Sequence, residues 1–308
     1  MSGGRRGVLL GTAAYLCWGL FPLYWPLLKP ASALEILSHR VVWSLAFVVV
    51  LLAARREWSW LAAIIRDRRR LTILAVASTV IAVNWGVYIW GVNNGHVVET
   101  ALGYFINPLV TVLIGVVLLG ERLRRLQWAA VGLGALAVVL LAVDYGRPPW
   151  IALVLAFSFA TYGLMKNKVA MPALQSLTVE TSMLFFPAMA VLVVLEARGT
   201  AAFGHAPAHV TALLACAGVV TAIPLLLFGA AAGQVPLSTM GLLQYLTPMM
   251  QFILGLVVFH EAMPASRWAG FALVWAALLV FSMDSLSHGR AQYGADAAAP
   301  SALTPEVH

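Results

Sequence analysis

The chain has 308 residues, of which 62% are apolar and only 10% are charged, and its mean hydropathy is +0.90. This composition excludes an ordinary soluble domain, in which about a quarter of the residues are charged. The net charge of +7 could suggest nucleic-acid binding, but the basic residues cluster between apolar runs, as in a membrane protein. We therefore expect an integral membrane protein with no nucleic-acid partner.

Ten apolar stretches of about 20 residues, each long enough to cross the hydrocarbon core, predict an all-α protein with ten transmembrane helices. In chain order they cover residues 8–28, 34–54, 71–92, 98–119, 125–143, 149–167, 176–196, 210–231, 237–258 and 266–284. The first stretch contains Trp18 and Gly19 followed by Pro22 and Pro26, so its outer end should be kinked or broken. It lacks a cleavage signature and is interpreted as a retained helix rather than a signal peptide. Residues 57–66 predict a short amphipathic surface helix or a plain basic loop.

The chain repeats part of itself with an offset of 140 residues. The recurring pairs are Pro108 and Pro248, Gly115 and Gly255, Glu121 and Glu261, Trp128 and Trp268, and Asp144 and Asp284. They predict two five-helix units, 1–146 and 147–286, followed by a disordered cytoplasmic tail, 287–308. Because five is odd, the two units must cross the membrane in opposite senses. Such 5+5 inverted repeats recur in transporters, with the solute site near the midplane.

The basic residues between the helices predict the orientation. With the N-terminus in the cytoplasm, fourteen of them lie inside and only Lys29, Arg147, Arg198 and Arg267 lie outside. Both termini are then cytoplasmic. Cys17 and Cys216 fall within predicted spans, so we expect no disulfide framework.

Motifs of soluble enzymes are missing from the sequence. His260-Glu261 could begin a zinc-protease motif, but Pro264 occupies the position of the second histidine. There is also no G-x-S-x-G, no P-loop and no glycine-rich dinucleotide turn. We therefore expect no catalytic residue, no metal and no cofactor.

Polar and aromatic residues at membrane depth are the candidates for a solute pathway. They are Trp18, Asn84, Trp85, Tyr88, Tyr104, Asn107, Tyr162, Gln244, Tyr245 and Gln251. Several lie on two proline-centred stripes at matching repeat positions, around Pro108 and Pro248, and amides facing lipid would be costly. The alternative is that these groups hydrogen-bond neighbouring helices. For a single amide we favour that alternative, for the paired stripes a cavity lining, and for Gly115 and Gly255 close packing.

Five ionisable residues inside predicted spans are candidates for gating or coupling: Glu35, His39, Arg40, Glu99 and Glu180. We expect Arg40 to pair with Glu99. Glu35 and His39, four residues apart, can pair, and His39 suits a proton-coupled step. Glu35 and Glu99 could equally reach the membrane surface. The outer gate at Glu35 should then be charged and pH-sensitive. The inner gate should be more apolar, because Leu184 and Phe185 follow Glu180. Glu121 and Glu261 are interpreted as caps of the helices that follow them.

Four strings carry a resemblance to a known family: Gly19 to Tyr24, Glu35-Ile-Leu-Ser-His-Arg40, Asn84-Trp85 and Gly103-Tyr-Phe-Ile-Asn-Pro-Leu109. They resemble the RarD subgroup of the EamA family, within the drug/metabolite transporter superfamily, over nearly the whole chain up to about Ser285. The second half departs from the pattern, with His260 where the first half has Gly120.

The resemblance implies a secondary transporter of the bacterial inner membrane, most often an exporter of amino acids, metabolites or drug-like compounds. Its partners would be a small-molecule solute and membrane lipids, and protons are a candidate coupling ion. A non-transporting membrane scaffold or assembly factor is the alternative, and an intramembrane enzyme is a third. The solute, the coupling ion, the direction of transport and the oligomeric state stay open at this point.

Overall fold

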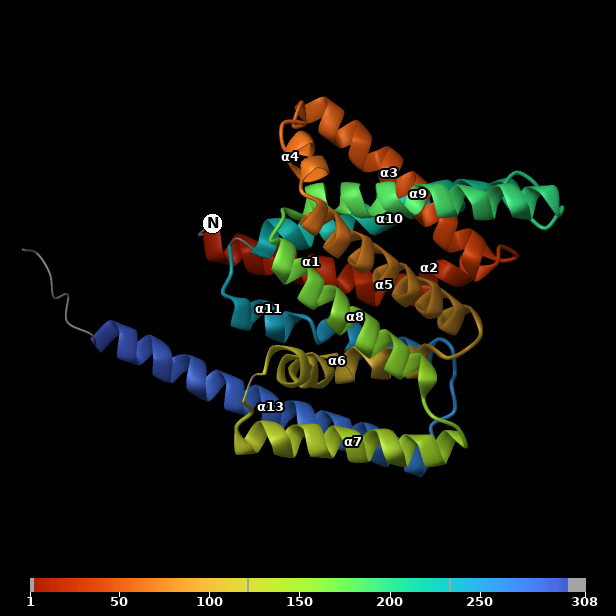
Figure 1. Ribbon diagram of the computed structural model, residues 1–308. Helices are drawn as coiled ribbons and strands as arrows, with labels where there is room; N and C mark the ends of the chain where they lie inside the picture. The colour runs from red at the N-terminus through yellow and green to blue at the C-terminus, as the bar shows by residue number, and fades with distance from the viewer. Residues whose placement is uncertain (1–2, 121, 233, 299–308) are drawn as a thin grey trace, which may run out of the picture.

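The computed structural model describes residues 3–120, 122–232 and 234–298, which fold into helices with no strand among them. In chain order the helices are α1 (Gly3–Gly19), α2 (Phe21–Tyr24), the 3-10 helix η1 (Trp25–Leu28), α3 (Ala33–Arg55), α4 (Leu61–Arg66), α5 (Arg68–Asn93), α6 (Val97–Leu119), α7 (Arg125–Tyr145), α8 (Trp150–Val169), α9 (Ala173–Ala197), α10 (Ala208–Ala232), α11 (Leu237–Leu243), α12 (Leu246–Val257) and α13 (Ala265–Ala298) (Figure 1). Each of the ten predicted spans has a helical counterpart. The predicted all-α fold is confirmed.

Within the described residues, eight helices are long and apolar enough to cross a membrane, and α1 with α2 and η1 makes a ninth. The remaining predicted span, the sixth, 149–167, corresponds to α8, whose last turn carries Lys166, Asn167 and Lys168 and is therefore more polar. The predicted tail, 287–308, is described only in part, because α13 ends at Ala298 and residues 299–308 lie outside the description. Its disorder stays a prediction.

Two spans are interrupted, and in each of them a proline lies in the first turn of the helix that follows the interruption. The first bends by 40° between Gly19 and Phe21, as predicted, with Pro22 in the first turn of the segment that follows. The second breaks between α11 and α12 at Gln244 and Tyr245, which places Pro248 in the first turn of α12, where a missing N–H is tolerated. Pro108 lies inside α6 without ending it. The matching prolines therefore occupy different local structures.

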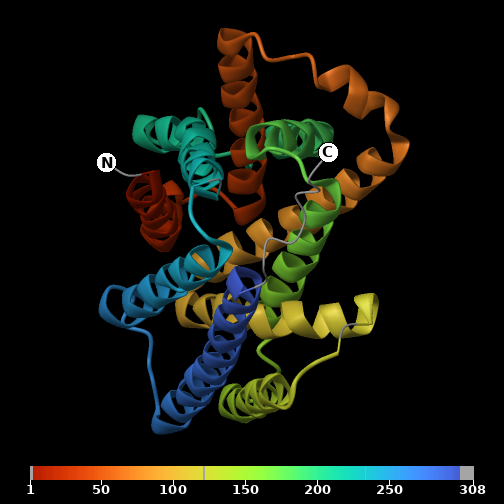
Figure 2. The same cartoon turned by 90° about the vertical axis from the view of Figure 1, so that its left-hand side faces the viewer.

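Helix packing has the same pattern when the two halves of the chain are exchanged. Taking α1, α3, α5, α6 and α7 as counterparts of α8, α9, α10, α12 and α13, three helices pack on their own counterparts: α3 on α9, α6 on α12 and α7 on α13. The largest of the remaining contacts come in matched pairs, α5·α8 with α10·α1, α6·α8 with α12·α1, and α3·α10 with α9·α5. Smaller contacts, such as that of α6 with α13, lack a counterpart of similar size. Figures 1 and 2 show α7 beside α13 along one side of the molecule.

Small residues allow some of these close contacts. A methyl group added at Gly255 would lie 2.7 Å from Cγ2 of Val98, at the contact between α12 and α6. This close contact is the packing role that we expected for Gly255.

At the connection between α3 and α5, the helix is shorter than the predicted segment 57–66, because α4 covers only Leu61–Arg66. Before α4, the Trp60 indole donates to the carbonyl of Glu57.

Candidate functional site

Asn84 on α5 connects three helices. Its side-chain nitrogen donates to the carbonyl of Leu155 at 3.0 Å and to Oγ of Ser158 at 2.9 Å, both on α8. Its side-chain oxygen accepts from the Tyr104 hydroxyl on α6 at 3.1 Å. Asn84 is buried and its amide is fully engaged, so here the structure matches the interhelical alternative rather than a free cavity lining.

Arg40 on α3 is surrounded by aromatic rings, one of which belongs to Trp85, the residue after Asn84 on α5. Its guanidinium carbon is 3.9 Å from the ring centroid of Trp85, 5.3 Å from that of Trp25 and 5.6 Å from that of Phe21. Tyr88 and Tyr104, whose rings meet edge to face at 5.7 Å, are close enough to interact electrostatically with it. The first half of the chain supplies all of these residues, from α2, η1, α5 and α6.

The side chain of Arg40 has no ion pair and no hydrogen bond among the described residues. Arg40 is 3% exposed, and its Nε is buried without an acceptor. A desolvated cation–π contact contributes about 2 kcal/mol, whereas removing such a cation from water costs several kcal/mol. The rings therefore offset only part of the cost of burying this charge.

The expected pair of Arg40 and Glu99 is wrong. Glu99, at the start of α6, binds Arg147 at 2.7 Å and accepts the backbone N–H of Ile151 at 3.2 Å. Arg147 lies in the short connection before α8, so both partners come from the segment that starts the second half. The hydrogen bond from Glu99 raises the pKa of Arg147 above its usual value.

The suggested pair of Glu35 and His39 is also wrong. Glu35 caps a loop instead: its Oε1 accepts the backbone N–H groups of Ala202 at 2.7 Å and Phe203 at 3.0 Å, between α9 and α10. The ring of His39 stacks on Phe203, with centroids 4.5 Å apart and an interplanar angle of 27°. Glu35 and His39 line a cavity of about 540 Å³ between α3 and α9, together with Trp43. Glu35 is 1% exposed, so it does not reach the membrane surface.

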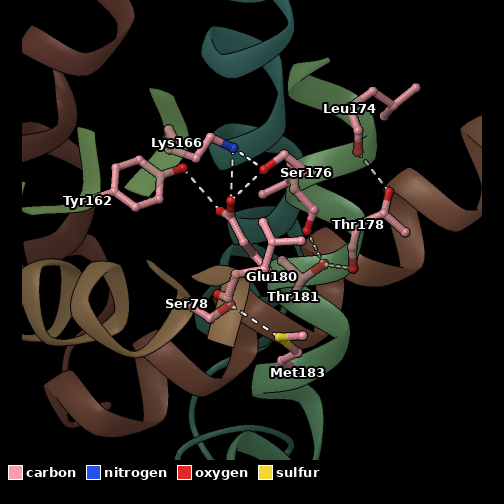
Figure 3. Close-up of polar contacts among 11 residues, drawn as sticks. Ser78, Tyr162, Lys166, Leu174, Ser176, Thr178, Glu180, Thr181 and Met183 are labelled. Atoms are coloured by element: carbon pink, nitrogen blue, oxygen red, sulfur yellow. Dashed lines mark hydrogen bonds and ion pairs between the residues drawn. The ribbon is translucent and has the colours of Figure 1, made fainter. Parts of the chain in front are cut away.

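Glu180 on α9 accepts from three side chains, which Figure 3 shows gathered around its carboxylate. Lys166 Nζ lies 2.8 Å from Oε1, the Ser176 hydroxyl donates to the same oxygen at 2.6 Å, and the Tyr162 hydroxyl donates to Oε2 at 3.0 Å. The expectation of an apolar inner gate is therefore wrong. Its physical reason is that the partners come from α8 and from the turn before Glu180, not from the apolar residues after it.

The second proline stripe ties α12 to α1. The Thr247 hydroxyl donates to the carbonyl of Tyr15 at 2.8 Å, and the Gln251 amide donates to the carbonyl of Trp18 at 3.3 Å. Gln244 and Tyr245 lie at the break between α11 and α12. The side-chain oxygens of Asn107 and Gln251 are buried without a donor. Among the described residues, the predicted pathway amides Asn107 and Gln244 make no side-chain hydrogen bond, and the oxygen of Asn107 is buried.

Glu261 caps a helix of the other half of the chain. Its carboxylate accepts the backbone N–H groups of Val97 and of Val98, the latter at 3.1 Å, at the start of α6. The prediction that it caps the helix after it is therefore wrong, and its counterpart Glu121 lies outside the described residues. Burial raises the pKa of Glu261 to about 7, against the lowering effect of the two N–H groups. Together with Glu99 and Arg147, it lines a cavity of about 280 Å³.

Two aspartate–arginine contacts hold the ends of α7 and α13 together. Asp144 at the end of α7 binds Arg267 at 2.9 Å, and Asp284 of α13 binds Nε of Arg124 at 2.8 Å. Sequence reasoning recognised the recurrence of the aspartates but missed their partners. The signal was available, since each arginine lies at the start of the helix that pairs with the aspartate's helix.

Comparison with known proteins identifies the family. Residues 5–143 match the EamA-like transporter family. The chain is 58% identical to "Protein RarD" of Streptomyces exfoliatus over 97% of this chain and 95% of that protein. The chain belongs to the EamA family. This EamA-family protein is of the RarD type, a multi-pass membrane transporter, as the resemblance of its sequence predicts.

Two further comparisons support the family assignment and the fold. The protein is 44% identical to "Protein RarD" of Escherichia coli (strain K12) over 92% of this chain and 95% of that protein. A solved structure described as "Crystal structure of protein" superposes with a TM-score of 0.55 and 16% identity, covering 89% of this chain and 96% of its own. Such a low identity extends the comparison to the fold alone. Membership of this bacterial family agrees with a location in the inner membrane.

Proposed function

We propose that this protein is a secondary-active carrier that exports small organic solutes by alternating access. The observation that supports it most is the packing pattern, in which the largest helix contacts recur when the two halves of the chain are exchanged. Two units related in this way can rock against each other and present one central site to either side in turn. Amino acids, metabolites and drug-like compounds are the solute classes within this proposal.

The proposed units are residues 1–146 and 147–286, inserted in opposite senses. The match to the EamA family ends at residue 143, close to the proposed end of the first unit. We place both termini in the cytoplasm, on the distribution of loop arginines and lysines. A cytoplasm-active reporter fused after Arg125 and after Arg290 should be active at both positions. Activity of a periplasmic reporter at these positions instead would reverse the orientation.

The proposed pathway runs between the halves, past the partly buried Trp18, Trp85, Asn107 and Tyr162. Asn84, Tyr88 and Tyr104 form its wall on α5 and α6, and Gln244, Tyr245 and Gln251 form it on the opposite unit. Because Asn84 is fully hydrogen-bonded, its proposed role is to hold the wall. Asn107, whose oxygen has no donor, is the amide that we propose to contact solute.

The proposed gates are the contacts of Glu35 and of Glu180. Moving α3 away from the loop before α10 would break the bonds from Glu35 to Ala202 and Phe203. Moving α8 away from α9 would separate Lys166 from Glu180. A contact that forms when one side closes biases the equilibrium between the two states. We propose protons as the coupling ion, because buried carboxylates lie at both gates.

Transport by purified protein in proteoliposomes tests the proposal against the scaffold alternative. Uptake and efflux of a panel of amino acids and other metabolites are measured with and without a pH gradient. We expect at least one solute to be transported, and its transport to be faster when the proton gradient is directed opposite to the movement of the solute. Asn107→Leu should reduce the rate of transport although the protein inserts into the membrane normally. Absence of movement for the whole panel, in vesicles that contain correctly folded protein, would favour the scaffold.

A further inference from the structure

The polar groups around Arg40 that have no partner are hydrogen-bond donors. Arg40 Nε, the indole Nε1 of Trp25 and the hydroxyl of Tyr88 are all buried without a hydrogen-bond partner. Trp25 contacts the guanidinium through its ring, and Tyr88 lies on α5, one turn after Trp85, which also contacts it. Arginine and the indole can only donate, and a tyrosine hydroxyl donates readily. The group that complements all three is an acceptor with negative charge.

The carboxylates of the protein are engaged elsewhere. Among the described residues, the buried acidic side chains are Glu35, Glu99, Glu180 and Asp284. Glu35 accepts from the loop before α10, Glu99 binds Arg147, Glu180 binds Lys166, and Asp284 binds Arg124. None of them is within ion-pair distance of Arg40. A buried cation of this kind normally has a counter-charge, and the residues that the structure describes do not supply one in this conformation.

The rings that contact the guanidinium provide no hydrogen-bond acceptor for its Nε. Trp85 lies over the guanidinium, with its ring centroid 3.9 Å from the central carbon. The N–H groups of arginine lie in the guanidinium plane and match the two oxygens of a carboxylate. A carboxylate in that plane would therefore bind Arg40 without displacing a hydrogen bond of the Nε group. Phe21, Trp25 and Trp85 add apolar surface next to it.

We infer that the solute of this carrier is an organic carboxylate, whose anionic group binds Arg40 while its apolar body contacts the surrounding rings. The inference rests on the proposed function, because it names the chemical class that the proposed carrier would move. It changes the role of Arg40 from a gate, as its position in the sequence indicated, to the anion-binding group of the central site.

Binding of benzoate to the full-length protein in detergent tests the inference. The midpoint of thermal unfolding is measured against increasing benzoate, at constant ionic strength, with benzamide and benzylammonium as neutral and cationic controls of the same size. We expect a saturable rise with benzoate up to about 10 mM, a concentration that occupies even a millimolar site. Benzamide and benzylammonium should give no such rise. Equal effects of benzoate and benzamide, or no rise with benzoate, would overturn the inference.

Variants assign the binding to Arg40. Arg40→Met removes the charge and keeps an apolar side chain, so it should fold and should weaken benzoate binding roughly thirty-fold or more. Arg40→Lys, which keeps the charge but loses the planar pair of donors, should bind with intermediate affinity and serves if the methionine variant does not fold. Arg55→Met, at the exposed end of the same helix, is the matched control and should bind as the unmodified protein does. Unchanged binding in Arg40→Lys and Arg40→Met would refute the assignment.

The result separates this inference from the proposed function. If benzoate binds through Arg40 but no solute of the panel moves in proteoliposomes, the anion site stands and the carrier proposal fails. If a neutral or cationic solute moves at the same rate in Arg40→Met, the carrier proposal stands and the carboxylate inference fails.

Discussion

Replacing Lys166 by methionine should destabilise the protein, because it leaves the carboxylate of Glu180 buried without its cation. Glu180 is 2% exposed, and Lys166 Nζ lies 2.8 Å from it. Removing one partner of a fully buried ion pair costs about 3–5 kcal/mol. Here the Lys166 side chain is 25% exposed and the hydroxyls of Tyr162 and Ser176 still donate to Glu180. We therefore expect the free energy of unfolding to fall by about 2 kcal/mol.

A double-mutant cycle isolates the contribution of the pair. Glu180→Gln should cost only about 1 kcal/mol, because a quarter-exposed lysine can still reach water. The double variant Lys166→Met/Glu180→Gln should be more stable than Lys166→Met, since no unpaired charge remains. We expect a coupling free energy of about 1–2 kcal/mol. Unfolding in mixed micelles with increasing sodium dodecyl sulfate, followed by circular dichroism, measures all four proteins.

Lys168→Met provides the matched control for the cycle. Lys168 lies two residues later on α8 and is exposed, so its replacement should change the stability by less than about 0.5 kcal/mol. A double variant that is no more stable than Lys166→Met, or a loss in Lys168→Met as large as that in Lys166→Met, would refute the reasoning.

Two further predictions follow from the described contacts. Because burial raises the pKa of Glu261 from 4.5 to about 7, its ionisation in the folded protein is disfavoured, so stability should fall as the pH rises from 4.5 to 7. The free energy of unfolding should fall by about 1–2 kcal/mol over this range, after a discount for the solvent-exposed part of the side chain. This fall should be absent in Glu261→Gln. Identical pH profiles of the two proteins would contradict the prediction. Asn84→Leu, which removes three hydrogen bonds, should lower the yield of folded protein, whereas Asn107→Leu and Gln244→Leu should fold normally and transport less. Size-exclusion profiles and initial transport rates measure both, and normal folding of Asn84→Leu would show that its bonds are dispensable.

The helices and the first break could be predicted from the sequence because their causes are local. A run of 20 apolar residues is sufficient to specify a spanning helix, and Pro22 specifies where α1 can no longer continue. The break before α12 was not predicted, since Pro108 and Pro248 match in the sequence while only the latter follows a break. What differs is the packing of neighbouring helices, which the local sequence does not contain.

The partners of the buried carboxylates could not be predicted, because each of their ion pairs joins different helices or segments that are distant in the sequence. Glu99 was expected to bind Arg40, and it binds Arg147, 48 positions later. Glu261 was expected to cap α13 and instead caps α6, whose start lies more than 160 positions earlier. Which helix ends meet is a property of the topology. The recurrence of Asp144 and Asp284 was the sequence signal closest to this information, since both end up at contacts between α7 and α13.

The buried carboxylates of the described residues have partners, whereas Arg40 has none among the same residues. Glu99, Glu261 and Asp144 all have partners at helix ends, where backbone N–H groups and loop arginines are available as donors. Glu180, which lies inside α9, has Lys166 of α8 as its partner. Arg40 lies at a similar depth inside α3 but has no such partner, and aromatic rings surround it instead. If the role of Arg40 were to hold helices together, a carboxylate on a facing helix would stabilise it better than rings can. Without such a carboxylate, the buried charge of Arg40 remains energetically unfavourable until an anion binds to it. The solute that binds most strongly is then the one whose anionic group compensates this charge.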